Sequence, residues 1–249
     1  MFFQHSKIKK VIIMSAFFSA MSLTSNAQLN LQLHHDFGKE LYGSELQTRP
    51  KTTLTVENFT ADKWGSTYFF VDADFSDDQM KSAYGEFSRE LQFWKAPIAI
   101  HLEYDGGLNS STSFQGAYLL GAAYNWNSKD FKRGFSLQAM YKHYAKSKGV
   151  EGFDSWQTTA VWHVIFAKDL MTFSGFADLW HDNSVKGNLV FISEPQIWFN
   201  LAALKCVDDN FKLSIGGELE LSNNFIWPSN GGTNDKFYAN PTLAVKWTF

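Results

Sequence analysis

Polar and aromatic side chains recur at every second position in several segments of this chain, and such sets could bind a small solute. Aromatic rings stack on flat rings, while carboxylates and amides exchange hydrogen bonds with amines and sugar hydroxyls. We predict substrate contacts from Phe70, Asp72, Tyr84, Glu86, Phe176, Asp178, Glu194, Gln196 and Asn200. Acids dominate this set, whereas pores for anions or phosphate carry Arg and Lys. The set therefore favours a neutral, ring-bearing solute or a cation over a nucleotide.

Catalytic and metal-binding chemistry finds less support in the spacing. A Ser–His–acid set would have to be drawn from scattered residues: Ser88, His101, His163, Ser174 and Asp178. No nucleophile motif surrounds either serine. His34 and His35 would point to opposite faces of a strand, so they cannot chelate one metal together. The sequence also shows no phosphate-binding loop and no metal-ligand spacing. We therefore predict no catalytic residue, no metal site and no cofactor.

The elements that would position these side chains are strands, because apolar residues occupy the intervening positions. Twelve segments show this alternation: 29–37, 50–58, 65–75, 82–94, 97–105, 115–126, 134–145, 154–166, 170–180, 189–201, 211–222 and 237–249. Most have about 9–14 residues, near the length of a tilted strand that crosses a bilayer. Shorter and longer connections alternate along the chain, as they do in bacterial outer-membrane barrels. We therefore predict an all-β fold, a single transmembrane antiparallel up-and-down β-barrel of about twelve strands.

The segment 237–249 shows the alternation most clearly. Phe249 and Trp247 lie on one face of the expected strand, and Thr248 and Lys246 lie on the other. An apolar face that ends on an aromatic residue is typical of the closing strand of an outer-membrane barrel. The segment also resembles the sorting signal that the barrel-assembly machinery recognises. We therefore expect this machinery and the outer-membrane lipids as partners.

The first 27 residues are typical of a secretory signal peptide. Lys7, Lys9 and Lys10 precede an apolar stretch that ends at the small-x-small motif of residues 25–27. Such a segment is removed after export and does not belong to the fold. We predict a signal peptide over 1–27 and one outer-membrane β-barrel over 28–249, in a Gram-negative bacterium.

Charge and composition agree with this assignment. Three of the 22 basic residues and none of the 25 acidic residues lie in the signal peptide, so the remaining chain carries 19 basic and 25 acidic residues, a net charge of −6. That acidity argues against nucleic acid as a partner. Aromatic residues make up 17% of the chain. Girdles of aromatic side chains at the two lipid interfaces of a barrel would account for that abundance.

The inward acids also have a purely structural interpretation. Small barrels fill their interior with packed side chains, including ion pairs and aromatic rings. Lys142 and Lys212 are bases that could neutralise neighbouring carboxylates. The sequence leaves open whether the inward set contacts a solute or packs the interior.

Three internal segments and the closing one carry a family resemblance. Residues 84–91 contain an aromatic–x–Glu–x–Ser pattern, residues 173–180 a Gly–Phe–x–Asp pattern, and residues 193–200 a Glu–Pro–Gln pattern. Together they resemble the nucleoside-specific channel-forming outer-membrane proteins (Tsx-like), in particular the short members from Bacteroides-type bacteria. The resemblance implies a narrow pore that passes nucleosides, deoxynucleosides or similar small solutes by facilitated diffusion, without energy or cofactor. The alternatives are a lipid-modifying barrel enzyme and a structural or adhesin barrel without transport.

Overall fold

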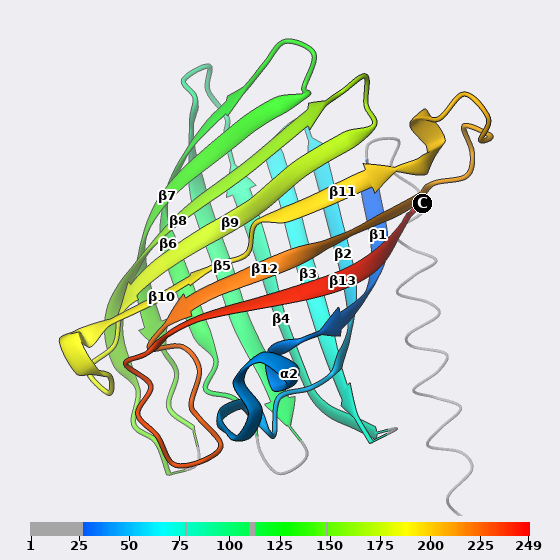
Figure 1. Cartoon of the computed structure of the whole chain (residues 1–249). Coiled ribbons are helices and arrows are strands. Elements are labelled where there is room, and N and C mark those ends of the chain that lie inside the picture. The colour runs from blue at the N-terminus through cyan, green and yellow to red at the C-terminus, as the bar shows by residue number, and fades with distance from the viewer. Residues whose placement is uncertain (1–26, 78, 110–112, 148) are drawn as a thin grey trace, which may run out of the picture.

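A computed structural model gives the fold and describes residues 27–77, 79–109, 113–147 and 149–249. The predicted signal peptide, residues 1–27, lies outside the described residues except for its last position, and it stays a prediction. Long β-strands that surround one interior make up most of the described chain (Figure 1).

The strands follow one another round the barrel largely in chain order, and each runs antiparallel to its neighbours. Their bounds are β1 (Ala27–Asp36), β2 (Thr52–Asp62), β3 (Gly65–Ser76), β4 (Gln79–Leu91), β5 (Ile98–Asn109), β6 (Ala117–Asn127), β7 (Arg133–Tyr144), β8 (Phe153–Phe166), β9 (Met171–His181), β10 (Leu189–Ser193), β11 (Gln196–Asn200), β12 (Leu213–Asn223) and β13 (Phe237–Thr248). β1 pairs with both β2 and β13, so the sheet closes on itself. The barrel wall has twelve positions, which we call staves, because the short strands β10 and β11 share one of them. The predicted fold class, a closed antiparallel barrel of about twelve strands, is confirmed.

β10 and β11 together form one of the twelve staves, since both lie between β9 and β12. The sequence predicts one strand over 189–201, but the structure interrupts it at Glu194 and Pro195. Pro195 has no N–H with which to continue the ladder. On the facing strand, a Cβ at Gly175 would lie 2.5 Å from the Glu194 carbonyl oxygen. The interruption spans two residues, so both halves of the stave keep the same alternation between inside and outside.

The two ends of the barrel carry different connections. The longest, residues 37–51 and 224–236, lie at one end, where the first of them forms helix α2 (Gly38–Tyr42) and the 3-10 helix η1 (Gly43–Leu46) (Figure 1). The other short 3-10 helices are η2 (Lys186–Asn188) and η3 (Leu201–Ala203). None of the helices in the described residues is long and apolar enough to cross a membrane.

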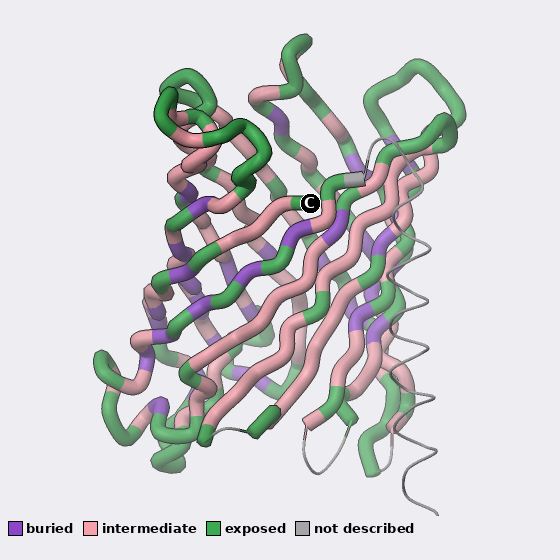
Figure 2. Tube along the Cα trace, turned by 90° about the vertical axis from the view of Figure 1, so that its right-hand side faces the viewer, coloured by how far each residue is buried: buried purple, intermediate pink, exposed green. Residues whose placement is uncertain are grey.

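Side chains alternate between the two faces of the wall, as predicted. In β5, His101 and Asp105 are buried while Ile100 and Leu102 are exposed, and Figure 2 shows this alternation along several strands. Large exposed apolar side chains stand on the outer face of most staves: Leu33, Val71, Phe87, Leu102, Leu120, Leu137, Trp156, Phe173, Ile215 and Leu243. A closed wall with an apolar exterior satisfies its backbone internally, which is the arrangement that a bilayer requires of a β-protein.

Candidate functional site

Aromatic rings line the interior of β3 and β4 in a continuous row. The ring centroid of Phe70 lies 6.2 Å from Tyr68 and 6.1 Å from Tyr84, and Phe114 follows 6.4 Å beyond Tyr84. Phe114 comes from the connection after β5, and its N–H donates to the Gly107 carbonyl oxygen at 2.8 Å. Gly107 leaves room for the ring, because a Cβ there would lie 2.5 Å from Phe114 Cδ2. We call Tyr68, Phe70, Tyr84 and Phe114 the aromatic row.

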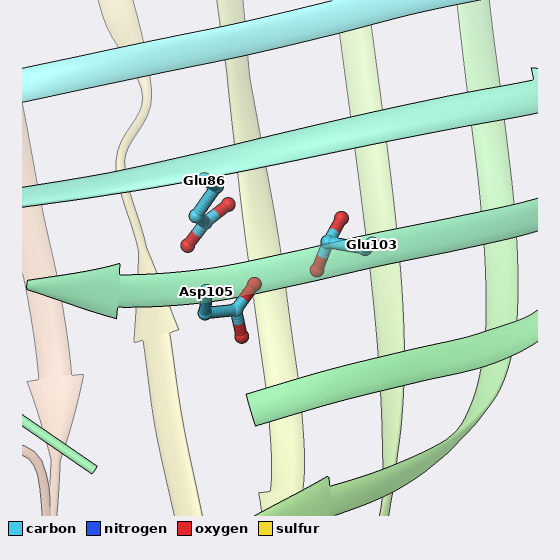
Figure 3. Close-up of side chains that lie close together, drawn as sticks. All are labelled: Glu86, Glu103 and Asp105. Atoms are coloured by element: carbon cyan, nitrogen blue, oxygen red, sulfur yellow. The ribbon is translucent and has the colours of Figure 1, made fainter. Parts of the chain in front are cut away.

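Carboxylates adjoin the aromatic row at Tyr84. The Tyr84 hydroxyl donates to Glu86 Oε1 at 2.8 Å. Glu86 lies opposite Asp105 in the pairing of β4 with β5, and Glu103 occupies the next inward position of β5. One oxygen from each of these three carboxylates lies within 4.8 Å of the others. The three side chains project into the same part of the interior (Figure 3), and we call them the carboxylate cluster.

Two basic side chains border the carboxylate cluster. Lys142 Nζ lies 3.3 Å from Asp105 Oδ2. His101 contacts Glu103 Oε2 at 3.0 Å and Glu90 Oε1 at 3.5 Å. One ammonium and one imidazole thus border the cluster and Glu90, which are four carboxylates in all. Acids are therefore in excess on this side of the interior.

Acids on opposite sides of the barrel are close enough to interact electrostatically. The charge of Asp178, on β9, is close enough to repel that of Glu86, on β4. In the same way, the charge of Asp72, on β3, repels that of Glu194, which lies at the interruption between β10 and β11. Phe176 shares the inward phase of Asp178 two residues earlier in β9. The structure thus brings the predicted residues of β3 and β4 opposite those of β9 and the interrupted stave.

Gln196 and Asn200 are occupied by contacts within the wall. The Gln196 amide donates to Glu218 at 2.8 Å and accepts the indole N–H of Trp198 at 2.9 Å. Asn200 donates to the Asp169 carbonyl oxygen at 2.8 Å, at the short connection between β8 and β9. These two predicted residues lie on the inner face, but their amide groups hold neighbouring staves together.

A second group of charges lies at the end with the long connections. Arg49, which precedes β2, donates to Asp36 at 2.8 Å and to Glu220 at 2.7 Å. Asp36 also accepts the Gly38 N–H at 2.7 Å, and Glu220 accepts the Ser222 hydroxyl at 3.1 Å. Burial lowers the pKa of Arg49, but Glu220 and Asp36 outweigh it and hold the pKa above its ordinary value. Arg49 is therefore charged, and we call Arg49, Asp36 and Glu220 the arginine network.

Residues 27–249 match the family described as a domain of unknown function, DUF5020. The chain belongs to this family. The matching family is not the nucleoside-specific channel family that the sequence resembles, so that resemblance stays a prediction. No curated protein matches the sequence.

The DUF5020 barrel is similar to solved porin structures. The NanC porin aligns with a TM-score of 0.53 and 9% identity, over 89% of this chain and 100% of the porin. The KdgM porin in complex with disordered oligogalacturonate aligns with a TM-score of 0.49 and 10% identity, over 89% of this chain and 99% of the porin. At such identity the NanC likeness shows a shared barrel fold, and the KdgM likeness is too weak to carry an argument.

Three interior side chains of the DUF5020 barrel were missed from the sequence: Phe114, Asp105 and Arg49. Asp105 continues the inward alternation of His101 and Glu103, so extending that pattern by one step would have found it. The adjacent glycines 106 and 107 signalled space beside the strand, but not which ring would fill it. No pattern in the sequence indicated that Arg49 turns inward.

The histidines considered for other chemistry have partners of their own. His101 faces two glutamates rather than a serine, and His163 Nε2 contacts the Phe131 carbonyl oxygen at 3.1 Å. His34 is buried and His35 exposed, so the prediction that they point to opposite faces is confirmed. His163 also lies opposite Ser174 in the pairing of β8 with β9, but no hydrogen bond joins the two side chains among the described residues.

Proposed function

We propose that the protein is an outer-membrane channel for facilitated diffusion of small neutral solutes, with nucleosides and deoxynucleosides as the preferred class. The observation that carries this proposal is the aromatic row, which meets Glu86 at Tyr84. The charge of Asp178, on β9, is close enough to interact with that of Glu86. Ring faces stack on a nucleobase, and carboxylates accept hydrogen bonds from amines and sugar hydroxyls. The row and the acids supply both kinds of contact side by side.

The proposed location is the outer membrane of a Gram-negative bacterium. The apolar outer face of the wall supports this placement, because a charge there would cost about 2–4 kcal/mol at the bilayer midplane. Lipids of that membrane would be the immediate neighbours of the barrel. Export through the signal peptide over 1–27 and insertion by the barrel-assembly machinery belong to the same proposal.

The interior charge supports neutral or cationic solutes over anions. Inward carboxylates of the described strands include Asp72, Asp74, Glu86, Glu103, Asp105, Asp178, Glu194 and Glu218. The cations that face the same interior include Lys142, Lys246 and Arg49. A phosphate group would be repelled by this excess of acids, since anion pores use rings of Arg and Lys.

Flux into liposomes tests the proposal. We expect labelled adenosine to enter vesicles that contain the folded barrel faster than a sugar of similar size, with saturation and competition by unlabelled nucleosides. Release of fatty acid from vesicle lipids would instead indicate a lipid-modifying enzyme. A folded barrel that passes neither solute would indicate a structural role, and either of these results would overturn the proposal.

The Phe176→Ala variant tests solute contact on β9. Stacking contributes about 1–3 kcal/mol per base in binding proteins, and a loss of about 1.4 kcal/mol is a factor of about ten in affinity. We therefore expect nucleoside competition to weaken about tenfold while small-ion conductance stays nearly unchanged. Phe173→Ala, which removes an exposed ring from the outer face of the same strand, is the matched control.

The companion variant Asp178→Asn keeps the size of the side chain and removes its charge. It should change solute selectivity more than stability if the carboxylate accepts a sugar hydroxyl. If Phe176→Ala and Asp178→Asn reduce the amount of folded barrel while transport per folded molecule stays the same, the two residues serve packing alone.

A further inference from the structure

The pairing of β4 with β5 places like charges opposite each other. Glu86 faces Asp105 in the register, and Glu103 lies one inward position along the same strand. Like charges directly opposite each other destabilise an antiparallel pair. The repulsion is stronger in a barrel interior than in bulk water, because the effective dielectric constant is lower. The cluster therefore requires a compensating positive charge.

Lys142 compensates only part of this charge. Its Nζ lies 3.3 Å from Asp105 Oδ2 and donates to the Gln157 amide oxygen at 2.7 Å. The same nitrogen lies 5.1 Å from the ring centroids of Tyr144 and Trp180. The other basic neighbour, the His101 imidazole, contacts Glu103 Oε2 at 3.0 Å. One ammonium and one imidazole beside three carboxylates still leave an excess of negative charge where the carboxylate oxygens converge.

A buried oxygen of Asp105 points to a further ligand. Asp105 is 5% exposed, and its Oδ1 has no hydrogen-bond partner in the described part of the chain. Its other oxygen is the one that Lys142 contacts. Buried carboxylate oxygens in proteins are ordinarily held by a donor or by a cation. The unpartnered oxygen and the excess of carboxylates are independent observations, and both indicate that this part of the interior can accept a cation.

We propose that Glu86, Glu103 and Asp105 bind a divalent cation inside the barrel, with calcium as the ion that suits them best. Calcium takes carboxylate and water oxygens at about 2.3–2.6 Å, so two ligands on opposite sides of one ion lie about 5 Å apart. The three carboxylate oxygens lie within 4.8 Å of one another, which lets one ion contact all of them. Water can supply the remaining ligands on the open side. This inference does not rest on solute transport.

Terbium luminescence provides a direct test. Tb³⁺ accepts the same oxygen ligands as calcium, and its emission is sensitised by a nearby aromatic ring such as Tyr84, whose hydroxyl donates to Glu86 at 2.8 Å. We expect folded barrel in detergent micelles at neutral pH to give saturable emission that added Ca²⁺ displaces. Asp105→Asn should weaken Tb³⁺ binding at least about tenfold, because calcium affinity follows the charge of the ligand set.

Asp74→Asn is the matched control, because Asp74 is an inward acid whose oxygens accept hydrogen bonds from Thr53 at 2.8 Å and Ser82 at 2.7 Å. Its Tb³⁺ affinity should equal that of the unmodified barrel. Heat-modifiable migration on a gel reports folding of each variant, and Glu103→Gln replaces Asp105→Asn if the latter does not fold.

Two results would overturn the proposal. One is the absence of saturable emission from the folded, unmodified barrel, which would mean that a shared proton rather than a metal ion relieves the repulsion. The other is unchanged Tb³⁺ affinity in both Asp105→Asn and Glu103→Gln. Solute flux does not enter either measurement, so the cation site and the channel function can fail separately.

Discussion

The arginine network and the carboxylate cluster both place acids inside the same barrel, yet their charges are balanced differently. Arg49 contacts both acids of its network, at 2.8 Å and 2.7 Å. In the cluster, Lys142 and His101 each contact one acid, and Asp105 Oδ1 is left without a hydrogen-bond partner in the described residues. The network is complete within the chain, whereas the cluster has capacity for a ligand. An inward acid therefore indicates a binding site only once its partners are known.

The largest effect is expected when the network loses its cation. Arg49→Ala leaves Asp36 and Glu220 without their partner, and removing one member of a buried ion pair costs about 3–5 kcal/mol. The Arg49 side chain is 20% exposed. We therefore expect the free energy of unfolding, measured by urea titration in micelles, to fall by about 3 kcal/mol.

Arg133→Ala, at an exposed position of β7, is the control for Arg49→Ala. It should change the free energy of unfolding by no more than about 0.5 kcal/mol. Equal stability of the two variants would show that Arg49 does not hold the network together, and the contrast with the cluster would disappear.

Removing one negative charge should change the free energy of unfolding in opposite directions in the arginine network and in the carboxylate cluster. Glu220→Gln weakens the hold on Arg49 and should cost about 1–2 kcal/mol. Glu86→Gln relieves repulsion from Asp105 and should stabilise the barrel by about 0.5 kcal/mol in the presence of a chelator. The new amide oxygen can still accept the Tyr84 hydroxyl. Urea titrations with a chelator measure both changes, and destabilisation of similar size by both would mean that the cluster is as fully compensated as the network.

An effect on solute affinity rather than on stability is expected in the aromatic row, which adjoins the cluster. Phe114 stands at the end of the row and is 39% exposed, so it offers one ring face to a solute. Phe114→Ala should weaken nucleoside competition in liposomes about threefold, or about 0.7 kcal/mol. Phe237→Ala, on the outer face, should leave competition unchanged. A threefold loss in both variants would assign the effect to the barrel wall rather than to ring stacking.

The strands and their phase were predictable because alternation depends only on the order of residues in the chain. In the predicted segment 97–105, a period of two puts His101 and Glu103 on one face and Ile100 and Leu102 on the other, and the structure shows the first pair inside and the second outside. The interruption of the tenth stave was not predicted, although Pro195 lies in it, because the alternation continues in phase on both sides. The two-residue period predicts which face a side chain lies on, but it does not show whether the hydrogen-bond ladder between two strands is continuous.

The carboxylate cluster could not be predicted, because it depends on register. Glu86 and Asp105 come from different strands and meet only through the pairing of β4 with β5. Arg49 and Phe114 come from connections, whose conformation is set by tertiary contacts rather than by a two-residue period. The nine predicted solute-contacting residues stay a prediction, and the contacts of Gln196 and Asn200 show that some inward amides serve the wall.

The interruption at Glu194 and Pro195 also has a mechanical consequence. A continuous hydrogen-bond ladder stiffens the wall, but Pro195 has no N–H to donate across to β12. The Phe176 carbonyl oxygen, in register with Glu194, is held by the Glu194 N–H at 3.0 Å and by the Ser193 hydroxyl at 2.8 Å. Thermal fluctuations of the cross-section concentrate where the wall is least reinforced. Phe176 and Glu194 stand beside the position where Pro195 withholds its bond, so we expect the wall to yield to a passing solute more readily there than at a fully paired stave.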